Sequence, residues 1–164
     1  GYEQGAKHID KDIEVKAIFT GTWDDPVRGK QAAKQLYSQK VDIIFQIAAL
    51  TGSGVLEAAK EEGKYAIGVD SNQNGLHPGK VLTSMVKRVD VAVYDAFITA
   101  KNDTFKPGVN VLGLKENGVD VAMDENNAPL ITPEMKAAVD KARADIIAGT
   151  VKPHDYMSDE TCPY

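Results

Sequence analysis

Apolar positions along the chain switch between helical and strand spacing. Tyr2, Ala6 and Ile9 recur at helical spacing, which predicts a helix at the very start of the sequence. No capping residue precedes this helix, so we expect the sequence to be a piece of a longer chain. Residues 14–20, EVKAIFT, are rich in residues that favour β-structure and predict a first strand.

A second helix is predicted directly after the loop GTWDDP. Asp25 and Pro26 suit the N-cap and the first turn of a helix that runs to about Gln39. Its helical spacing predicts one buried apolar stripe, formed by Val27, Ala32, Ala33, Leu36 and Tyr37.

Strands and helices then alternate at short spacing. The near-continuous apolar run at residues 41–48 predicts a strand buried on both faces. Residues 54–62 predict a helix that ends at Gly63, and residues 64–70 and 80–86 predict two further strands. This alternation is typical of a parallel sheet covered by helices, so we expect an α/β fold.

The second half of the chain predicts two helices and a hairpin. Residues 89–101 form a helical pattern whose apolar stripe needs a partner surface. Residues 110–124, NVLGLKENGVDVAMD, predict a pair of strands that turn at an Asn-Gly dipeptide. A last helix is predicted from Pro133 to about Ala148, with Gly149 ending it.

Residues that could contact a ligand follow each predicted strand. Trp23 lies in the loop after the first strand, residues 48–54 follow the second, Asp70 ends the third, and Lys87 stands just beyond the fourth. Taken alone, Asp70 could cap a turn, Trp23 could be a core aromatic residue and Lys87 could be a solvated charge. Ligands of parallel α/β sheets bind outside the carboxyl ends of the strands, so the joint position of these residues favours a ligand site.

Composition and motifs exclude several other functions. The net charge of −5 and the pI near 5.2 supply no basic surface, so we expect no nucleic-acid partner. The three histidines have no metal-ligand spacing, and the TGSGV stretch lacks the third glycine of a dinucleotide fingerprint. The single cysteine, Cys162, cannot form an internal disulfide. We therefore expect no catalytic residue, no metal and no cofactor.

Several ordered segments of the chain carry a resemblance to a known family. GYEQGAK, TGTWDDPVRGKQAA, VDIIFQIAALTGSGVLEAAKEEGKYAIGVDSNQ and VLTSMVKRVDVAVYDAF together resemble the basic membrane protein family of ABC-transporter substrate-binding lipoproteins. The best-understood members of that family bind purine nucleosides. The likeness runs over residues 1–97, and NAPLITPEM and ADIIAGTVKP are similar to the C-terminal end of the family.

The resemblance implies a type I periplasmic-binding fold, in which two α/β lobes close on a ligand. Family members carry an additional N-terminal lobe, so this chain would be mainly the C-terminal lobe. Residues 1–86 would form this ligand-binding lobe, and residues 87–106 would be a crossover helix packed on the absent lobe. Residues 107–164 would return to the lobe and hinge as a hairpin, a helix and a tail.

The same resemblance implies roles for individual residues. Asp70 would accept hydrogen bonds from ribose hydroxyls, and Lys87 would donate to the same sugar or hold Asp70 ionised. Trp23 would stack on the purine ring. The backbone of three further residues would line the cleft: Ala49, Gly52 and Gly54.

The implied function is the substrate-binding component of an ABC uptake transporter. It would deliver a purine nucleoside or nucleobase to a permease, in the periplasm or at the outer face of a bacterial cell membrane. Contact with the membrane would be only through an N-terminal lipid anchor or signal that this chain does not contain. The alternative is a ligand-sensing domain of a signalling or transcription regulator with the same fold. An enzyme acting on nucleosides would need a base or metal site that the motifs do not provide.

Overall fold

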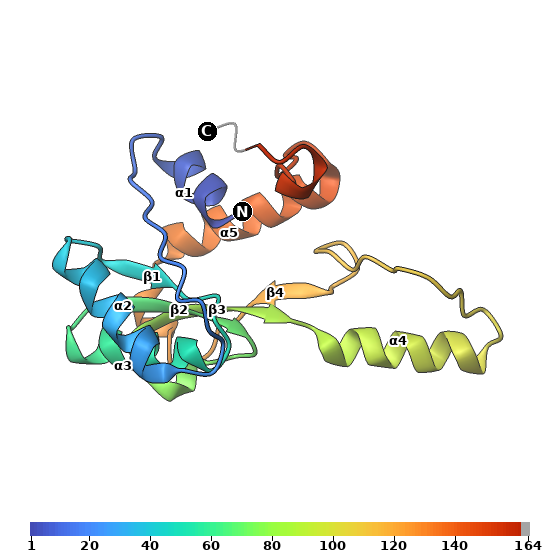
Figure 1. Cartoon of the computed structure of the whole chain (residues 1–164). Coiled ribbons are helices and arrows are strands. Elements are labelled where there is room, and N and C mark those ends of the chain that lie inside the picture. Colours follow the sequence, from blue (N-terminus) through green and yellow to red (C-terminus); the bar gives the residue numbers. More distant parts are fainter. Residues whose placement is uncertain (162–164) are drawn as a thin grey trace. The chain divides into compact units, whose positions relative to one another are not determined.

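The computed structural model describes residues 1–161, so Cys162 lies outside the described residues. The chain forms two compact units (Figure 1). The larger unit is Thr20–Pro133, and the smaller unit combines Gly1–Phe19 with Glu134–Tyr164.

A four-stranded sheet forms the centre of the larger unit. Its strands are β1 (Ile43–Phe45), β2 (Tyr65–Asp70), β3 (Val81–Lys87) and β4 (Val119–Val121), in the order β1-β2-β3-β4. The first three strands are parallel and β4 is antiparallel to β3. The predicted α/β class is therefore confirmed, with a mixed sheet in place of a purely parallel one.

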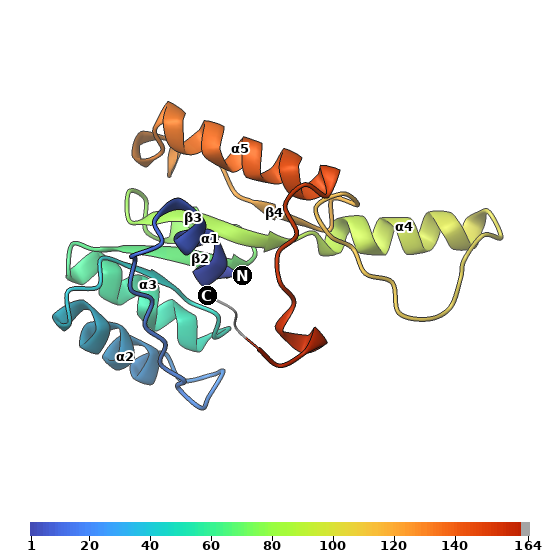
Figure 2. The same ribbon diagram turned by 90° about the horizontal axis from the view of Figure 1, so that it is seen from above.

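Two helices cover the sheet in successive layers. Helix α3 (Thr51–Glu61) packs on β2, and α2 (Pro26–Ser38) packs on α3, as Figure 2 shows from above. The predicted N-cap of α2 is confirmed, because the Asp25 side chain accepts a hydrogen bond from the Arg28 N–H at 3.0 Å. Gly63 follows α3 with a φ of +65°, the left-handed conformation that glycine tolerates.

Close contact between α2 and α3 depends on glycine. A Cβ atom on Gly54 would lie 1.8 Å from the Pro26 carbonyl oxygen, and one on Gly29 would lie 2.0 Å from the Thr51 carbonyl oxygen. The two helices therefore approach at a distance that no larger residue permits. Beside this contact lies a core of small and aliphatic side chains with one tyrosine: Ala33, Tyr37, Val55, Leu56, Ala58, Ala59, Ala66 and Val81.

The strand predicted at residues 14–20 is wrong. The segment has no strand partner, and Phe19 is 96% exposed. Residues that favour β-structure form a strand only where a neighbouring strand is present to pair with their backbone. Without a strand at residues 14–20 beside it, β1 lies at the edge of the sheet with three half-buried residues, so the prediction of a doubly buried strand over residues 41–48 is also wrong.

The predicted buried stripe of α2 is wrong at one position, because Val27 is 66% exposed.

The predicted hairpin at residues 110–124 is wrong as well. Its first half is not a strand, and its second half, β4, pairs with β3 through partners such as Met85 and Val121. The Asn-Gly dipeptide closes a turn in which the Gly118 N–H donates to the Gly113 carbonyl oxygen at 2.9 Å. The longer β3 offers an open edge along the sheet, and β4 takes that edge in place of a local partner.

Helix α4 (Val89–Lys101) has the predicted bounds, and none of its residues is buried. Figures 1 and 2 show it continuing beyond the end of β3. Five of its large apolar side chains are exposed: Val89, Val93, Tyr94, Phe97 and Ile98.

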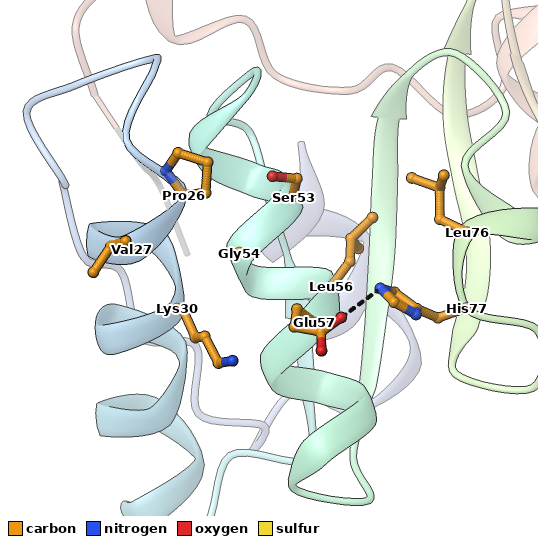
Figure 3. Close-up of a pocket in the computed structure, with 9 residues that line it drawn as sticks. All are labelled: Pro26, Val27, Lys30, Ser53, Gly54, Leu56, Glu57, Leu76 and His77. Atoms are coloured by element: carbon orange, nitrogen blue, oxygen red, sulfur yellow. Dashed lines mark ion pairs between the residues drawn. The ribbon is translucent and has the colours of Figure 1, made fainter.

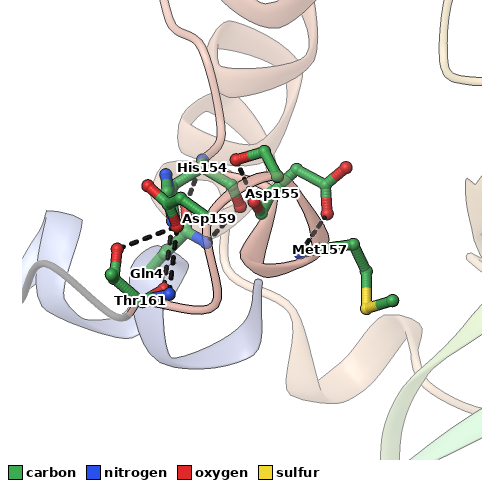
Figure 4. A network of polar contacts seen from close by, with 7 residues as sticks. Gln4, His154, Asp155, Met157, Asp159 and Thr161 are labelled. Atoms are coloured by element: carbon green, nitrogen blue, oxygen red, sulfur yellow. Dashed lines mark hydrogen bonds and ion pairs between the residues drawn. The ribbon is translucent and has the colours of Figure 1, made fainter.

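Two helices of the smaller unit also match the predictions. They are α1 (Tyr2–Ile9) and α5 (Pro133–Ala148), and Gly149 follows α5 with a φ of +75°. The Gln4 side chain of α1 makes two hydrogen bonds with the backbone of His154, at 2.8 and 2.7 Å, within the polar network in Figure 4. Three short 3-10 helices complete the described residues: η1 (Asn74–Leu76), η2 (Ala128–Leu130) and η3 (Tyr156–Ser158).

We expect Gly54→Ala to lower the free energy of unfolding by about 1–3 kcal/mol, because the new methyl group forces α2 and α3 apart. Urea denaturation measures this change. Gly75→Ala is the matched control, since its Cβ would meet only the Asn126 side chain, at 3.6 Å. Equal stability of the two variants would contradict the close-packing explanation.

Candidate binding site at the carboxyl edge of the sheet

The ends of β2 and β3 bring a carboxylate and an ammonium group together. Asp70 ends β2 and Lys87 ends β3, and the Lys87 Nζ lies 2.7 Å from the Asp70 Oδ1. Their side chains are 50% and 58% exposed, so this ion pair contributes at most about 1 kcal/mol to stability. Its position is more informative. Both groups lie at the carboxyl edge, by which we mean the ends of β1, β2 and β3 and the loops that follow them.

Asp70 has an unusual backbone conformation. Its φ is +68°, and the Ser71 N–H donates to the Val69 carbonyl oxygen at 2.8 Å. A hydrogen bond over three residues with a positive central φ defines a γ-turn of the rare, strained kind. Strained residues of this sort concentrate at ligand sites, where the fold holds a side chain in one orientation.

The loop that carries Trp23 is fixed by the buried Thr51. The Thr51 N–H donates to the Trp23 carbonyl oxygen at 3.1 Å, and the Thr51 hydroxyl donates to the Thr22 carbonyl oxygen at 3.2 Å. The same hydroxyl oxygen accepts from the Asp25 N–H at 2.9 Å. Trp23 is thus tied to the carboxyl edge although no strand precedes it. Its side chain is 66% exposed, which contradicts the alternative of a core aromatic residue.

The three residues predicted to line the cleft come from the loop between β1 and α3 and from the first turn of α3, and they make different contributions. Ala49 is exposed at the carboxyl edge and has a φ of +47°. Gly52 is buried, and a Cβ there would lie 1.7 Å from the Gln46 Oε1. Gly54 is buried against α2, as described above.

The backbone amides at the start of α3 already have partners. The Gly52 N–H donates to the Ala49 carbonyl oxygen at 3.1 Å, and the Ser53 N–H donates to the Leu50 carbonyl oxygen at 3.0 Å. A phosphate-binding loop needs such N–H groups to point at the ligand. This helix start is therefore a packed turn, and of the three backbone residues predicted here only Ala49 is exposed.

A polar network that the sequence does not predict supports the carboxyl edge. The Gln73 Oε1 accepts from the Gln46 side-chain amide at 2.8 Å and from the Val69 N–H at 3.0 Å. The Gln73 N–H donates to the Ser84 hydroxyl at 3.0 Å, and that hydroxyl donates to the Asn74 Oδ1 at 2.9 Å. The polar run SNQN after β2 is the only sequence signal for this network, and it gives no indication of the partners.

Asp124 links the loop after β2 to the segment after β4. Its carboxylate accepts from the Asn72 and Asn74 side-chain amides at 2.6 and 3.2 Å. These hydrogen bonds, that of Asn72 first, together with one from the Asn126 N–H, lower the pKa of Asp124 below its ordinary value of 3.8. Nearby, the buried Asn127 donates to the Leu82 carbonyl oxygen at 2.7 Å.

A separate groove of about 410 Å³ lies over α3 (Figure 3). Within it the His77 Nε2 lies 3.3 Å from the Glu57 Oε2. Gly54 is the single residue that the groove shares with the predicted site residues. Its remaining lining residues are Pro26, Val27, Lys30, Ser53, Leu56 and Leu76.

The described residues contain neither a metal cluster nor a membrane span. No group of three or more His, Cys, Asp or Glu side chains among them could hold a metal ion. In the same part of the chain, no helix combines the length and apolar character that crossing a membrane requires. What the carboxyl edge offers is the exposed Asp70–Lys87 pair, and the loop tied to it carries an exposed aromatic ring.

Comparison with known proteins shows the family to which the chain belongs. Residues 1–154 match the family Bmp, described as ABC transporter substrate-binding protein PnrA-like. The chain belongs to the Bmp family. It is 42% identical to basic membrane protein D of Borreliella burgdorferi over 77% of its length, and 38% identical to basic membrane protein A of the same species over 90%. It spans 38% and 44% of those two relatives.

Solved structures support the Bmp assignment at the level of fold. An ABC transporter solute-binding protein from Aeropyrum pernix aligns over 96% of the chain with a TM-score of 0.73 and 28% identity. A transcriptional activator of the comK gene from Bacillus halodurans aligns over 92% with a TM-score of 0.82 and 23% identity, which shows the fold alone. The chain covers about half of each of these structures, 53% and 52%.

We expect Asp124→Asn to weaken the fold in a pH-dependent way. Because the folded state lowers the pKa of Asp124, its carboxylate stabilises the fold fully above pH 3.8, and this contribution is lost as the pH falls through the lowered value. The stability difference between wild type and variant should therefore shrink in acid. Thermal unfolding at neutral pH and at low pH measures it, and a difference that does not change with pH would contradict the assignment.

Proposed function

We propose that this chain is the C-terminal lobe of a substrate-binding protein that delivers a purine nucleoside or nucleobase to an ABC permease. The observation that carries the proposal is the Asp70–Lys87 ion pair at the open carboxyl edge. A ribose hydroxyl is both donor and acceptor, so it suits a carboxylate and an ammonium group placed 2.7 Å apart.

Trp23 supports the purine part of the proposal. The backbone of its loop is fixed by Thr51 while the ring is 66% exposed, so the ring is available for stacking. Stacking of a base on an aromatic side chain contributes about 1–3 kcal/mol. Hydrogen bonds to charged groups such as Asp70 add about 1.5–3 kcal/mol each.

The exposed apolar side chains of α4 support a two-lobed arrangement. We propose that residues 87–106 cross to a second lobe, and that residues 107–164 return to the hinge. The curated relatives are more than twice as long as this chain, which leaves room for such a lobe. Ligand would then bridge both lobes and favour the closed state that a permease recognises.

Membership of the family supports a proposal about location and partners. We propose that the protein works in the periplasm or at the outer face of a bacterial cell membrane, held there by a lipid anchor or directed there by a signal outside the present sequence. The proposal includes no catalytic step. A ligand-sensing role is the alternative, and the likeness to the Bacillus halodurans activator does not favour it, since that likeness concerns the fold alone.

Titration with purine nucleosides tests the ligand. Trp23 is the only tryptophan in the chain, so tryptophan emission reports on this site alone. We expect adenosine, guanosine or inosine to change the emission saturably and ribose to change it little. Unchanged emission across the panel would contradict the purine assignment.

Asp70→Asn tests the role of the carboxylate. We expect it to weaken nucleoside binding about tenfold or more, which corresponds to the loss of one charged hydrogen bond. Asp95→Asn on the exposed helix α4 is the matched control and should bind like wild type. Equal affinity of the two variants would rule out Asp70 as a ligand acceptor.

A further inference from the structure

The γ-turn at Asp70 lies where β2 extends beyond its neighbour. Strand β1 pairs with β2 from Tyr65 to Ile67, and the last hydrogen bond on this side runs from the Gln46 N–H to the Ile67 carbonyl oxygen at 3.3 Å. The next N–H group of β2 on the same side belongs to Val69 and lies beyond the end of β1. Its partner is the Gln73 Oε1, at 3.0 Å, so a side-chain amide takes the place of a strand carbonyl.

The Gln73 side chain is itself held in place. The Gln46 side-chain amide donates to the same Oε1 at 2.8 Å, and Gln46 is only 2% exposed. The Gln46 Oε1 in turn accepts from the Ala48 N–H at 3.3 Å. The two glutamines therefore join the turn at Asp70 to the turn at Ala49, and both turns contain a non-glycine residue with positive φ.

Two glycines make room for this glutamine pair. A Cβ on Gly52 would lie 1.7 Å from the Gln46 Oε1, and a Cβ on Gly68 would lie 2.8 Å from the Gln73 Oε1 and 2.5 Å from the Ser84 Oγ. Gly52 comes from α3 and contacts Gln46, and Gly68 comes from β2 and contacts Gln73. A larger residue at either position would displace one of the two glutamine side chains.

We infer that Gln73, held by Gln46, is the positioning residue that sets the direction of the Asp70 carboxylate. The inference rests on the proposed function for its consequence, which is ligand affinity. The Gln73 side chain fixes the Val69 N–H, directly before Asp70. The Gln73 N–H donates to the Ser84 hydroxyl and so fixes the chain after Asp70. With both sides fixed, Asp70 stays in the γ-turn and its carboxylate stays on Lys87.

Gln73→Met tests the inference, because methionine keeps the size of the side chain and removes the acceptor oxygen. NMR measures the backbone of Asp70 through its three-bond HN–Hα coupling and Cβ shift, and measures hydrogen exchange at the Val69 N–H. We expect Asp70 to lose the coupling and Cβ shift of a residue with positive φ, and the Val69 N–H to exchange about tenfold faster. Adenosine affinity should fall about tenfold. The melting temperature should fall as well, because the variant leaves the Gln46 side-chain amide and the Val69 N–H without their acceptor.

Two further variants separate positioning from general damage. Gln73→Glu keeps acceptor oxygens for Val69 and Gln46, so it should restore the Asp70 signature. Gly68→Ala crowds the Ser84 Oγ and the Gln73 Oε1, the two atoms that hold Gln73 in place, and should reproduce the effect of Gln73→Met. Gln31→Met, on the exposed side of α2, and Gly75→Ala are the controls, and both should behave like wild type.

The outcomes distinguish the inference from the proposed function. An unchanged Asp70 signature in folded Gln73→Met protein would overturn the inference, and so would a lost signature with unchanged adenosine affinity. If adenosine does not bind even the wild type, the proposed ligand is wrong. The Asp70 signature and the Val69 exchange rate then still decide whether Gln73 positions Asp70.

Discussion

Parallel pairing of β2 with β1 on one side and β3 on the other is the constraint on which the rest of the larger unit depends. It places three strand ends at one edge, so the residues that follow them meet there although they are far apart in sequence. The layers of α3 and α2 cover the sheet and fix the turn that carries Trp23. Asp70 and Lys87 then face each other because adjacent parallel strands end side by side.

The carboxyl edge is built mainly from contacts that hold loops, and few of its groups remain open to a ligand. Thr51 holds the Trp23 loop, Gln46 and Gln73 hold the two strand-end turns, and Asp124 holds the loop after β2. These polar contacts have well-defined partners, and every buried side-chain nitrogen or oxygen among the described residues has one. A rigid support of this kind favours binding, because the exposed groups lose little freedom when a ligand arrives.

Local signals predicted the helices well, although α3 begins at Thr51 and not at Gly54 as predicted. Asp25 marks the start of α2 and Gly149 follows the end of α5, because capping depends on residues next to each other in sequence. Prediction failed where pairing is distant. Residues 14–20 have the composition of a strand but no neighbouring strand, and β4 pairs with β3 in place of its local partner. For the site, the exposed charges at Asp70 and Lys87 could be read from the sequence, whereas the partners of Gln46 and Gln73 depend on tertiary contacts.

We propose that the carboxyl edge, and not the groove over α3, binds a purine nucleoside. An NMR titration of this chain with adenosine tests it most directly, because backbone amide shifts locate even weak binding. We expect saturable shifts at Trp23, Ala49, Asp70 and Lys87, and unchanged shifts at Val27 and Leu76 of the groove. Shifts confined to the groove, or no saturable shift at the carboxyl edge, would contradict it.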